Sequence, residues 1–144
     1  MRINVVAVSL IGLVAVVGAR SALRAQPTQS VWDGVYTEAQ AARGDEVFQQ
    51  ECSMCHGQGL MGGEMAPGLA EGAFRSNWNG LTLGDMFDRI RVSMPPDDPG
   101  RLSRKQVADV LARLLAANQF PAGTNELYDR SEMLQMIKFE AARP

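Results

Sequence analysis

The chain has 144 residues, of which 46% are hydrophobic and 21% are charged, and this length is typical of a single domain. Its formal net charge of -2 argues against a nucleic-acid-binding protein, which usually carries a surplus of basic residues. Two cysteines are too few for the disulfide framework of a small secreted protein, and one histidine excludes zinc sites built from several histidines.

The first 25 residues have the pattern of an export signal. Residues 3–19 form an uncharged apolar run, preceded only by Met1 and Arg2 and followed by a polar segment with small residues. We predict cleavage after Ala25 and a periplasmic location for the mature, acidic chain. The alternative is an uncleaved anchor in the inner membrane, for which the run is close to the minimum of about 17 residues.

Three helices are predicted in the rest of the chain, with long ordered loops between them. They span residues 37–52, 83–92 and 103–118. Thr37, Thr82 and Ser103 are suitable N-caps, and each is followed three residues later by a glutamine or an aspartate. The glycine-rich stretch 56–80 is predicted to be a loop with at most one short turn.

The chain is therefore predicted to be all-α, with one domain over residues 26–120. Residues 121–144 are predicted to form an extension packed on this domain, either as a brief helix or as an extended segment. Three modest helices bury little apolar surface, so we expect a large apolar group to complete the core.

Residues 52–56 read Cys-Ser-Met-Cys-His, which is the C-x-x-C-H attachment signature of c-type haem. On a helical turn, the thiols of Cys52 and Cys55 can each bond one vinyl group, and His56 can then bind the iron. A thiol–disulfide redox pair is one alternative, but such a pair normally opens a helix after a strand. A structural zinc site would need two more ligands than the chain offers. We expect one covalently bound haem c per chain.

Iron bound by one histidine takes a second axial ligand or keeps an open site. Because the chain has no second histidine, methionine is the expected ligand type, and Met94 after the second helix is the first candidate. Met61 and Met65 in the glycine-rich loop are alternatives, as is an open site. Met86 lies on the apolar stripe of the second helix and is expected to fill the core.

Three further residues are expected to support the haem. The carbonyl of Pro67 is the candidate acceptor for the second imidazole N–H of His56. Leu69 is expected to pack against the haem face. The indole N–H of Trp78 is expected to bind a haem propionate, or else Trp78 fills the core.

Together these features resemble the class I monohaem cytochromes c, over residues 37–118. The elements of the resemblance occur in the family's order: Gly44 and Phe48 in the first helix, Cys52-x-x-Cys55-His56, the Pro67/Leu69 turn, Met94-Pro95 and the last helix. The resemblance implies a cytochrome c fold around the haem and a role as an electron carrier, not an enzyme.

One position departs from the family's pattern. The last helix of these cytochromes usually carries an aromatic residue where it crosses the first helix, and this chain has Arg113 there. We expect Arg113 either to stack on Phe48 or to point into solvent.

The flanking segments 31–37 and 119–123 are similar to those of cytochrome c subunits that accompany quinoprotein (PQQ) alcohol dehydrogenases. This similarity implies redox partner proteins: a dehydrogenase as electron donor, and a terminal oxidase or another acceptor in the respiratory chain. The alternative function is a haem protein with an open sixth site, acting in ligand binding or catalysis. The basic cluster of Arg101, Arg104 and Lys105 is predicted to be a solvated helix start and not a docking patch.

Overall fold

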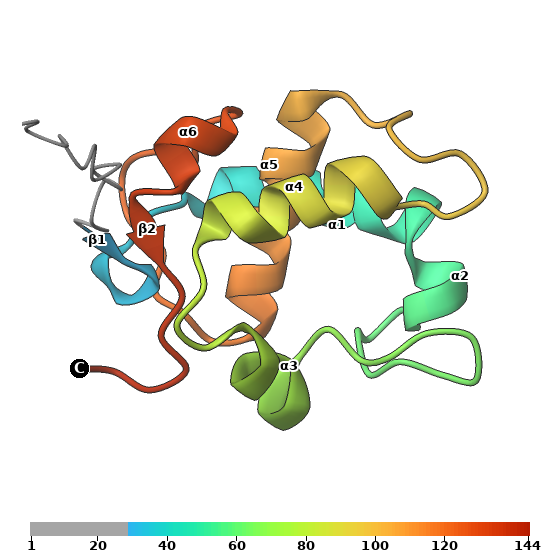
Figure 1. Ribbon diagram of the computed structural model, residues 1–144, viewed down its shortest axis with the longest axis horizontal. Helices are drawn as coiled ribbons and strands as arrows, with labels where there is room; N and C mark the ends of the chain where they lie inside the picture. The colour runs from blue at the N-terminus through green and yellow to red at the C-terminus, as the bar shows by residue number, and fades with distance from the viewer. Residues whose placement is uncertain (1–28) are drawn as a thin grey trace, which may run out of the picture.

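The computed structural model describes residues 29–144, and the expected signal segment, residues 1–25, lies outside this part of the chain. The described part is built mainly of helices (Figure 1). The elements are β1 (Gln29–Ser30), a 3-10 turn (Val31–Asp33), α1 (Glu38–Glu51), α2 (Ser53–His56), α3 (Glu71–Trp78), α4 (Leu83–Ser93), α5 (Arg104–Ala117), α6 (Ser131–Leu134) and β2 (Ile137–Lys138). The fold is all-α, as predicted. Within residues 29–144, no helix combines the length and the apolar character that crossing a membrane requires.

The three predicted helices correspond to α1, α4 and α5, and they begin at the predicted caps. The Thr37 hydroxyl accepts a hydrogen bond from the N–H of Gln40 at 3.1 Å, which satisfies one of the unpaired donors of the first turn. Thr82 and Ser103 each form a reciprocal capping box with the residue three positions later. The local sequence therefore determines where these helices start.

The stretch 56–80, predicted to be a loop, contains the eight-residue helix α3. None of the usual start signals precedes it, because Ala70 has no capping side chain and Glu71 has a φ of +63°. Contacts distant in sequence hold the helix instead: Phe74 is buried, and the N–H of Glu71 donates to the side chain of Asn118 at 2.9 Å. Tertiary packing creates this helix, which explains why the local sequence does not indicate it.

Helices α1 and α5 cross in close contact, with their main chains meeting at Gly44 (Figure 1). A Cβ atom on Gly44 would overlap the carbonyl oxygen of Asp109, so only glycine allows this approach. One turn further along α5, Nε of Arg113 donates to the Asp45 carboxylate at 2.6 Å. Arg113 thus forms an ion pair, and the two arrangements expected for it, stacking on Phe48 or pointing into solvent, are wrong.

The C-terminal residues contain both forms that the sequence left open, the brief helix α6 and the extended strand β2. Strand β2 pairs in parallel with β1, which joins the two ends of the described chain. Leu134, Ile137 and Phe139 are buried. The ring of Phe139 lies 5.1 Å from that of Phe120 and 6.1 Å from that of Phe74, measured between centroids. The tail therefore contributes apolar side chains to the core.

The side chain of Gln40, three residues after the N-cap Thr37, does not form a capping box with it. It is 1% exposed and binds both main-chain groups of Leu127 instead. Nε2 donates to the Leu127 carbonyl at 3.2 Å, and Oε1 accepts the Leu127 N–H at 2.8 Å. A buried amide that satisfies two main-chain groups fastens the tail to α1.

Candidate functional site

The C-x-x-C-H motif lies where α1 ends and the short helix α2 begins. The N–H of Cys52 still donates to the carbonyl of Phe48 at 2.9 Å, but its φ of -126° ends α1. Its carbonyl then accepts the N–H groups of Cys55 and His56 at 3.2 and 3.0 Å. One turn therefore carries both thiols and the imidazole. Both cysteines are free and partly buried.

The surroundings of Cys52 keep its thiol protonated. Burial, with a smaller effect of the neighbouring Glu51 carboxylate, raises the pKa of the Cys52 thiol to about 11, and Arg101 acts in the opposite direction. Arg101 is itself paired with Glu51 at 2.5 Å. Thiol–disulfide exchange requires a thiolate, and centres for that reaction lower the pKa of the attacking cysteine. The raised pKa of Cys52 therefore argues against the redox-pair alternative.

The main chain holds the imidazole of His56 in one orientation. Its Nδ1 lies 2.8 Å from the carbonyl oxygen of Pro67, the acceptor that the sequence indicated. Because a carbonyl oxygen only accepts, Nδ1 carries the proton and Nε2 has the lone pair available to a metal. The side chain is 9% exposed. A histidine with a fixed tautomer and a fixed ring is suited to bind haem iron.

Hydrogen bonds within the loop 57–69 place Pro67 under the imidazole. The N–H of Leu69 donates to the carbonyl of Leu60 at 2.7 Å, and the Leu60 side chain is 1% exposed. Gly62 has a φ of +79°, and a side chain there would collide with the backbone at Pro67. Glycine at this position lets the two arms of the loop touch, so the loop folds back on the haem motif.

Comparison with known families shows the family to which the chain belongs. A family model described as "cytochrome C oxidase, cbb3-type, subunit III" matches residues 39–112, just over half of the chain, including the C-x-x-C-H motif. The chain belongs to this cytochrome c family. No curated protein and no solved structure matches it significantly. Membership in the family implies a covalently bound haem c and a role in electron transfer.

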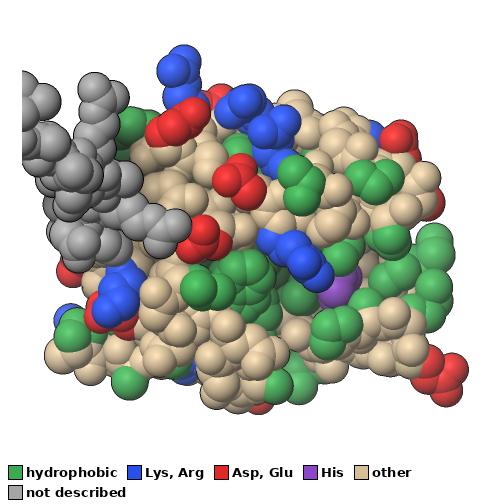
Figure 2. All heavy atoms as spheres, in the orientation of Figure 1, with side chains coloured by type: hydrophobic (Ala, Val, Ile, Leu, Met, Phe, Trp, Pro, Cys, Tyr) green, Lys and Arg blue, Asp and Glu red, His purple; other side chains and the backbone are tan. Residues whose placement is uncertain are grey.

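The apolar residues of this cytochrome c domain suit a haem. Several apolar side chains pack against the core but stay partly exposed, among them Cys52, Leu69, Trp78 and Ile90. Figure 2 shows the histidine, in purple, at the surface beside a group of hydrophobic side chains. Haem c requires two free thiols, an imidazole with Nε2 available and apolar side chains that it can cover, so the residues fit the group. Ile90 was not expected here, because its spacing on α4 is that of an ordinary core residue.

The two tryptophans differ in their hydrogen bonding. The indole N–H of Trp32 donates to the carbonyl of Glu140 at 2.9 Å. The indole N–H of Trp78, in contrast, has no acceptor among residues 29–144, although the ring is partly buried against the core. A partly buried indole usually finds an acceptor, so that of Trp78 is available to a group bound beside it.

Met94 lies at the C-terminal end of α4, where the chain leaves the helix. Its N–H still bonds to the last turn, but its own backbone is extended, with φ -129° and ψ 142°. Met94 is half-buried and the next residue, Pro95, is buried. The alternative ligands Met61 and Met65 are 66% and 72% exposed. Met86 is 2% exposed in the core, as predicted.

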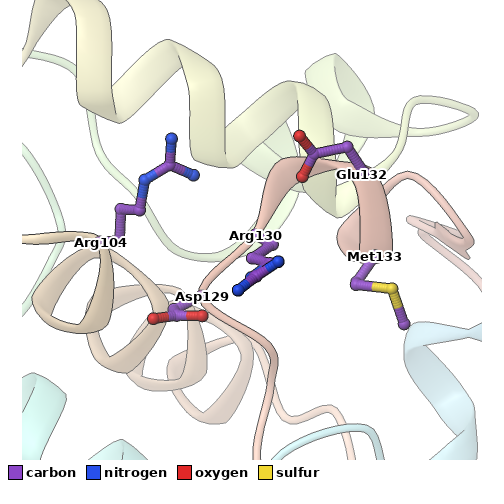
Figure 3. Close-up of a pocket in the computed structure, with 5 residues that line it drawn as sticks. All are labelled: Arg104, Asp129, Arg130, Glu132 and Met133. Carbon is purple, nitrogen blue, oxygen red and sulfur yellow. The ribbon is translucent and has the colours of Figure 1, made fainter.

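The three residues of the basic cluster near the start of α5 differ in their contacts. Arg101 pairs with Glu51 and Asp97, and Lys105 pairs with Asp109. Arg104 points into an open pocket of about 490 Å³ (Figure 3). The pocket is lined by Arg104, Asp129, Arg130, Glu132 and Met133. Its charges are of both signs, and no residue of the C-x-x-C-H motif lines it.

Proposed function

We propose that the protein is a periplasmic one-electron carrier with one haem c. Thioether bonds from Cys52 and Cys55 would hold the haem, and His56 and Met94 would bind its iron. The observation that carries the proposal is the 2.8 Å contact between His56 Nδ1 and the Pro67 carbonyl, on a turn that also presents two free thiols. The bound haem iron supplies the reversible change of one electron.

Met94 is the proposed second ligand because of its position. It is half-buried at the end of α4, whereas Met61 and Met65 are mostly exposed to water. A thioether favours ferrous iron and raises the reduction potential. Because His56 and Met94 would stay bound in both oxidation states, little rearrangement accompanies electron transfer, and the transfer is fast.

Leu69 and Trp78 have the supporting roles. The partly exposed side chain of Leu69 packs on the core and excludes water from the site. The indole N–H of Trp78, which has no acceptor among residues 29–144, would donate to a haem propionate. Burial of the partly exposed apolar side chains by the haem would complete the core, in line with the small amount of apolar surface that the helices alone bury.

The proposed electron donor is a dehydrogenase, such as a quinoprotein, and the acceptor is a terminal oxidase or another component of the respiratory chain. Two observations support this. The flanking segments 31–37 and 119–123 resemble those of the quinoprotein-associated subunits, which favours a quinoprotein as the donor. The matching family model is described as an oxidase subunit, which favours an oxidase as the acceptor. Export by residues 1–25 would bring the carrier to the periplasm.

Film voltammetry of the haem-containing protein tests the proposal. We expect one reversible one-electron wave whose midpoint does not change with scan rate, because no ligand is lost or gained. Optical titration should give the same midpoint through a single set of isosbestic points. A wave that becomes irreversible on slow scans would indicate exchange of the axial ligand and would favour an open sixth site.

A further inference from the structure

The side chain of Asn118 joins the end of α5 to the loop that holds His56. It is 1% exposed, and its amide is fully engaged. Nδ2 donates to the carbonyl oxygens of Leu69 at 3.0 Å and Leu114 at 2.8 Å, and Oδ1 accepts the N–H of Glu71 at 2.9 Å. Figure 1 shows this end of α5 beside α3. One buried amide thus fixes residues 69–71 to the end of α5.

The backbone of Glu71 shows that this attachment is enforced. Its φ of +63° lies in the left-handed region, which residues other than glycine rarely adopt. Such a conformation persists only where the surroundings determine it. The hydrogen bond from the Glu71 N–H to Asn118 is the contact that does so. The hydrogen bond to Asn118 therefore holds residues 69–71 against α5 in spite of the local strain at Glu71.

A short series of hydrogen bonds and chain segments connects Asn118 to His56. The carbonyl of Leu69 is held by Asn118, and the N–H of Leu69 is held by the carbonyl of Leu60 at 2.7 Å. Pro67 is only two residues earlier in the chain, and its ring restricts the backbone further. With both main-chain groups of Leu69 fixed, the Pro67 carbonyl has little freedom to move away from His56 Nδ1.

We propose that Asn118 is a positioning residue for the haem ligand His56. By fixing residues 69–71, it keeps the Pro67 carbonyl at hydrogen-bonding distance from the imidazole and so contributes to setting the reduction potential. A firm hydrogen bond from Nδ1–H makes the imidazole a stronger donor to iron, which favours the ferric state and lowers the potential. This inference rests on the proposed function, and it assigns a role to a residue that lies outside the family match.

The test compares Asn118→Ala with Gln40→Ala in the haem-containing protein. Gln40 is the matched control, because it is also 1% exposed and also binds two main-chain groups, but those of Leu127. Both variants should unfold at lower temperature. Only Asn118→Ala should raise the reduction potential. Only this variant should also speed hydrogen exchange at the Glu71 amide and at His56 Nδ1–H, with each exchange rate rising by about tenfold or more.

A folded Asn118→Ala protein with an unchanged or lower potential, or a rise equal to that in Gln40→Ala, would overturn the proposal. If Asn118→Ala does not fold, Glu71→Gly is added, because glycine removes the strain at φ +63° and leaves Leu69 unattached. The double variant must still show the raised potential. Failure of the proposed function is seen separately, as a wild-type protein without a haem spectrum.

Discussion

The main chains of α1 and α5 touch where Gly44 faces Asp109. A Cβ atom on Gly44 would overlap the Asp109 carbonyl oxygen, and the Cβ atom of Arg113 would lie 3.1 Å from it. Because backbone on both sides fills the space, no rotation of a side chain can relieve the overlap. This crossing sets how α5 lies against α1, and α1 leads directly into the haem motif. The position of the motif therefore depends on the absence of a side chain at residue 44.

We expect Gly44→Ala to destabilise the protein in spite of the better helix propensity of alanine. Overpacking costs about 1–3 kcal/mol or more, whereas alanine in place of glycine gains only about 1 kcal/mol in a helix. Thermal unfolding followed by circular dichroism measures the difference. Gly72→Ala in α3 is the control, because nothing lies within 4 Å of a Cβ atom there, and it should be neutral or stabilising. Equal stability of the two variants would show that the helices separate easily.

The ion pair between Asp45 and Arg113 predicts a pH-dependent contribution to stability. The hydrogen bond from Arg113 is the main cause that lowers the pKa of Asp45. A lowered pKa in the folded state means that the pair stabilises the protein above the unfolded pKa of about 4 and loses this effect as the pH falls through the folded value. Asp45→Asn should therefore be less stable at pH 7, by under about 1 kcal/mol because the carboxylate is partly exposed.

Urea unfolding of wild type and Asp45→Asn at several pH values gives the measurement. The difference in the free energy of unfolding should narrow steadily below pH 4 or so. Asp98→Asn is the control, since the Asp98 carboxylate makes no ion pair among residues 29–144, and it should leave the profile unchanged. A constant difference for Asp45→Asn down to acidic pH would mean that the ion pair is not its source.

Much of the fold follows from local sequence signals, and what does not has a physical cause. The caps Thr37, Thr82 and Ser103 act within four residues of themselves, so the starts of α1, α4 and α5 can be predicted. Helix α3 depends on Asn118, 47 residues after Glu71, and the tail depends on Gln40, 87 residues before Leu127. Hydrogen bonds over such separations leave no periodic pattern in the sequence.

In the candidate site, too, some features could be predicted from the sequence and others could not. The hydrogen bond between His56 and Pro67 could be anticipated, because the histidine needs an acceptor and the loop is rich in glycine. The ion pair of Arg113 could not, since a pattern that expects an aromatic residue says nothing about Asp45. The hydrogen bonds from Asn118 to residues 69–71 could not be predicted either, because an asparagine at the end of a helix is common for reasons of capping alone.

The surface around α2 and the loop after it predicts how partners are approached. Met54, Met61 and Met65 are 88%, 66% and 72% exposed, and between residues 53 and 66 Glu64 is the one acidic or basic residue other than His56. Electron self-exchange between oxidised and reduced protein, measured by NMR, should therefore depend little on salt. Electrostatically steered encounters, in contrast, change in rate by a factor of about 10 to 1,000.

Lysines placed on this surface should change that behaviour. For Met61→Lys combined with Met65→Lys, like charges oppose each other, so self-exchange at low salt should slow by about tenfold and recover at high salt. Met133→Lys on α6 is the control and should leave the rate unchanged. An unaffected rate in the double variant would place the electron exit elsewhere on the molecule.

Replacement of Met94 tests the second ligand. Met94→Leu should remove the sulfur-to-iron charge-transfer band, allow carbon monoxide to bind and lower the reduction potential by tenths of a volt, within the range of about 0.8 V that axial ligands span. Met61→Leu and Met65→Leu should change none of these properties. Loss of the band in either of those variants instead would transfer the role of ligand to the glycine-rich loop.

The optical spectrum of the exported protein tests the central claim most directly. The protein is made in a host with haem-attachment machinery and is recorded oxidised, reduced, and reduced with carbon monoxide. We predict sharp c-type bands on reduction, a weak sulfur-to-iron band on oxidation, and no shift with carbon monoxide, which together define a carrier with His56 and Met94 ligands. A high-spin spectrum that shifts readily with carbon monoxide would contradict this ligation, and a colourless protein would contradict the presence of haem.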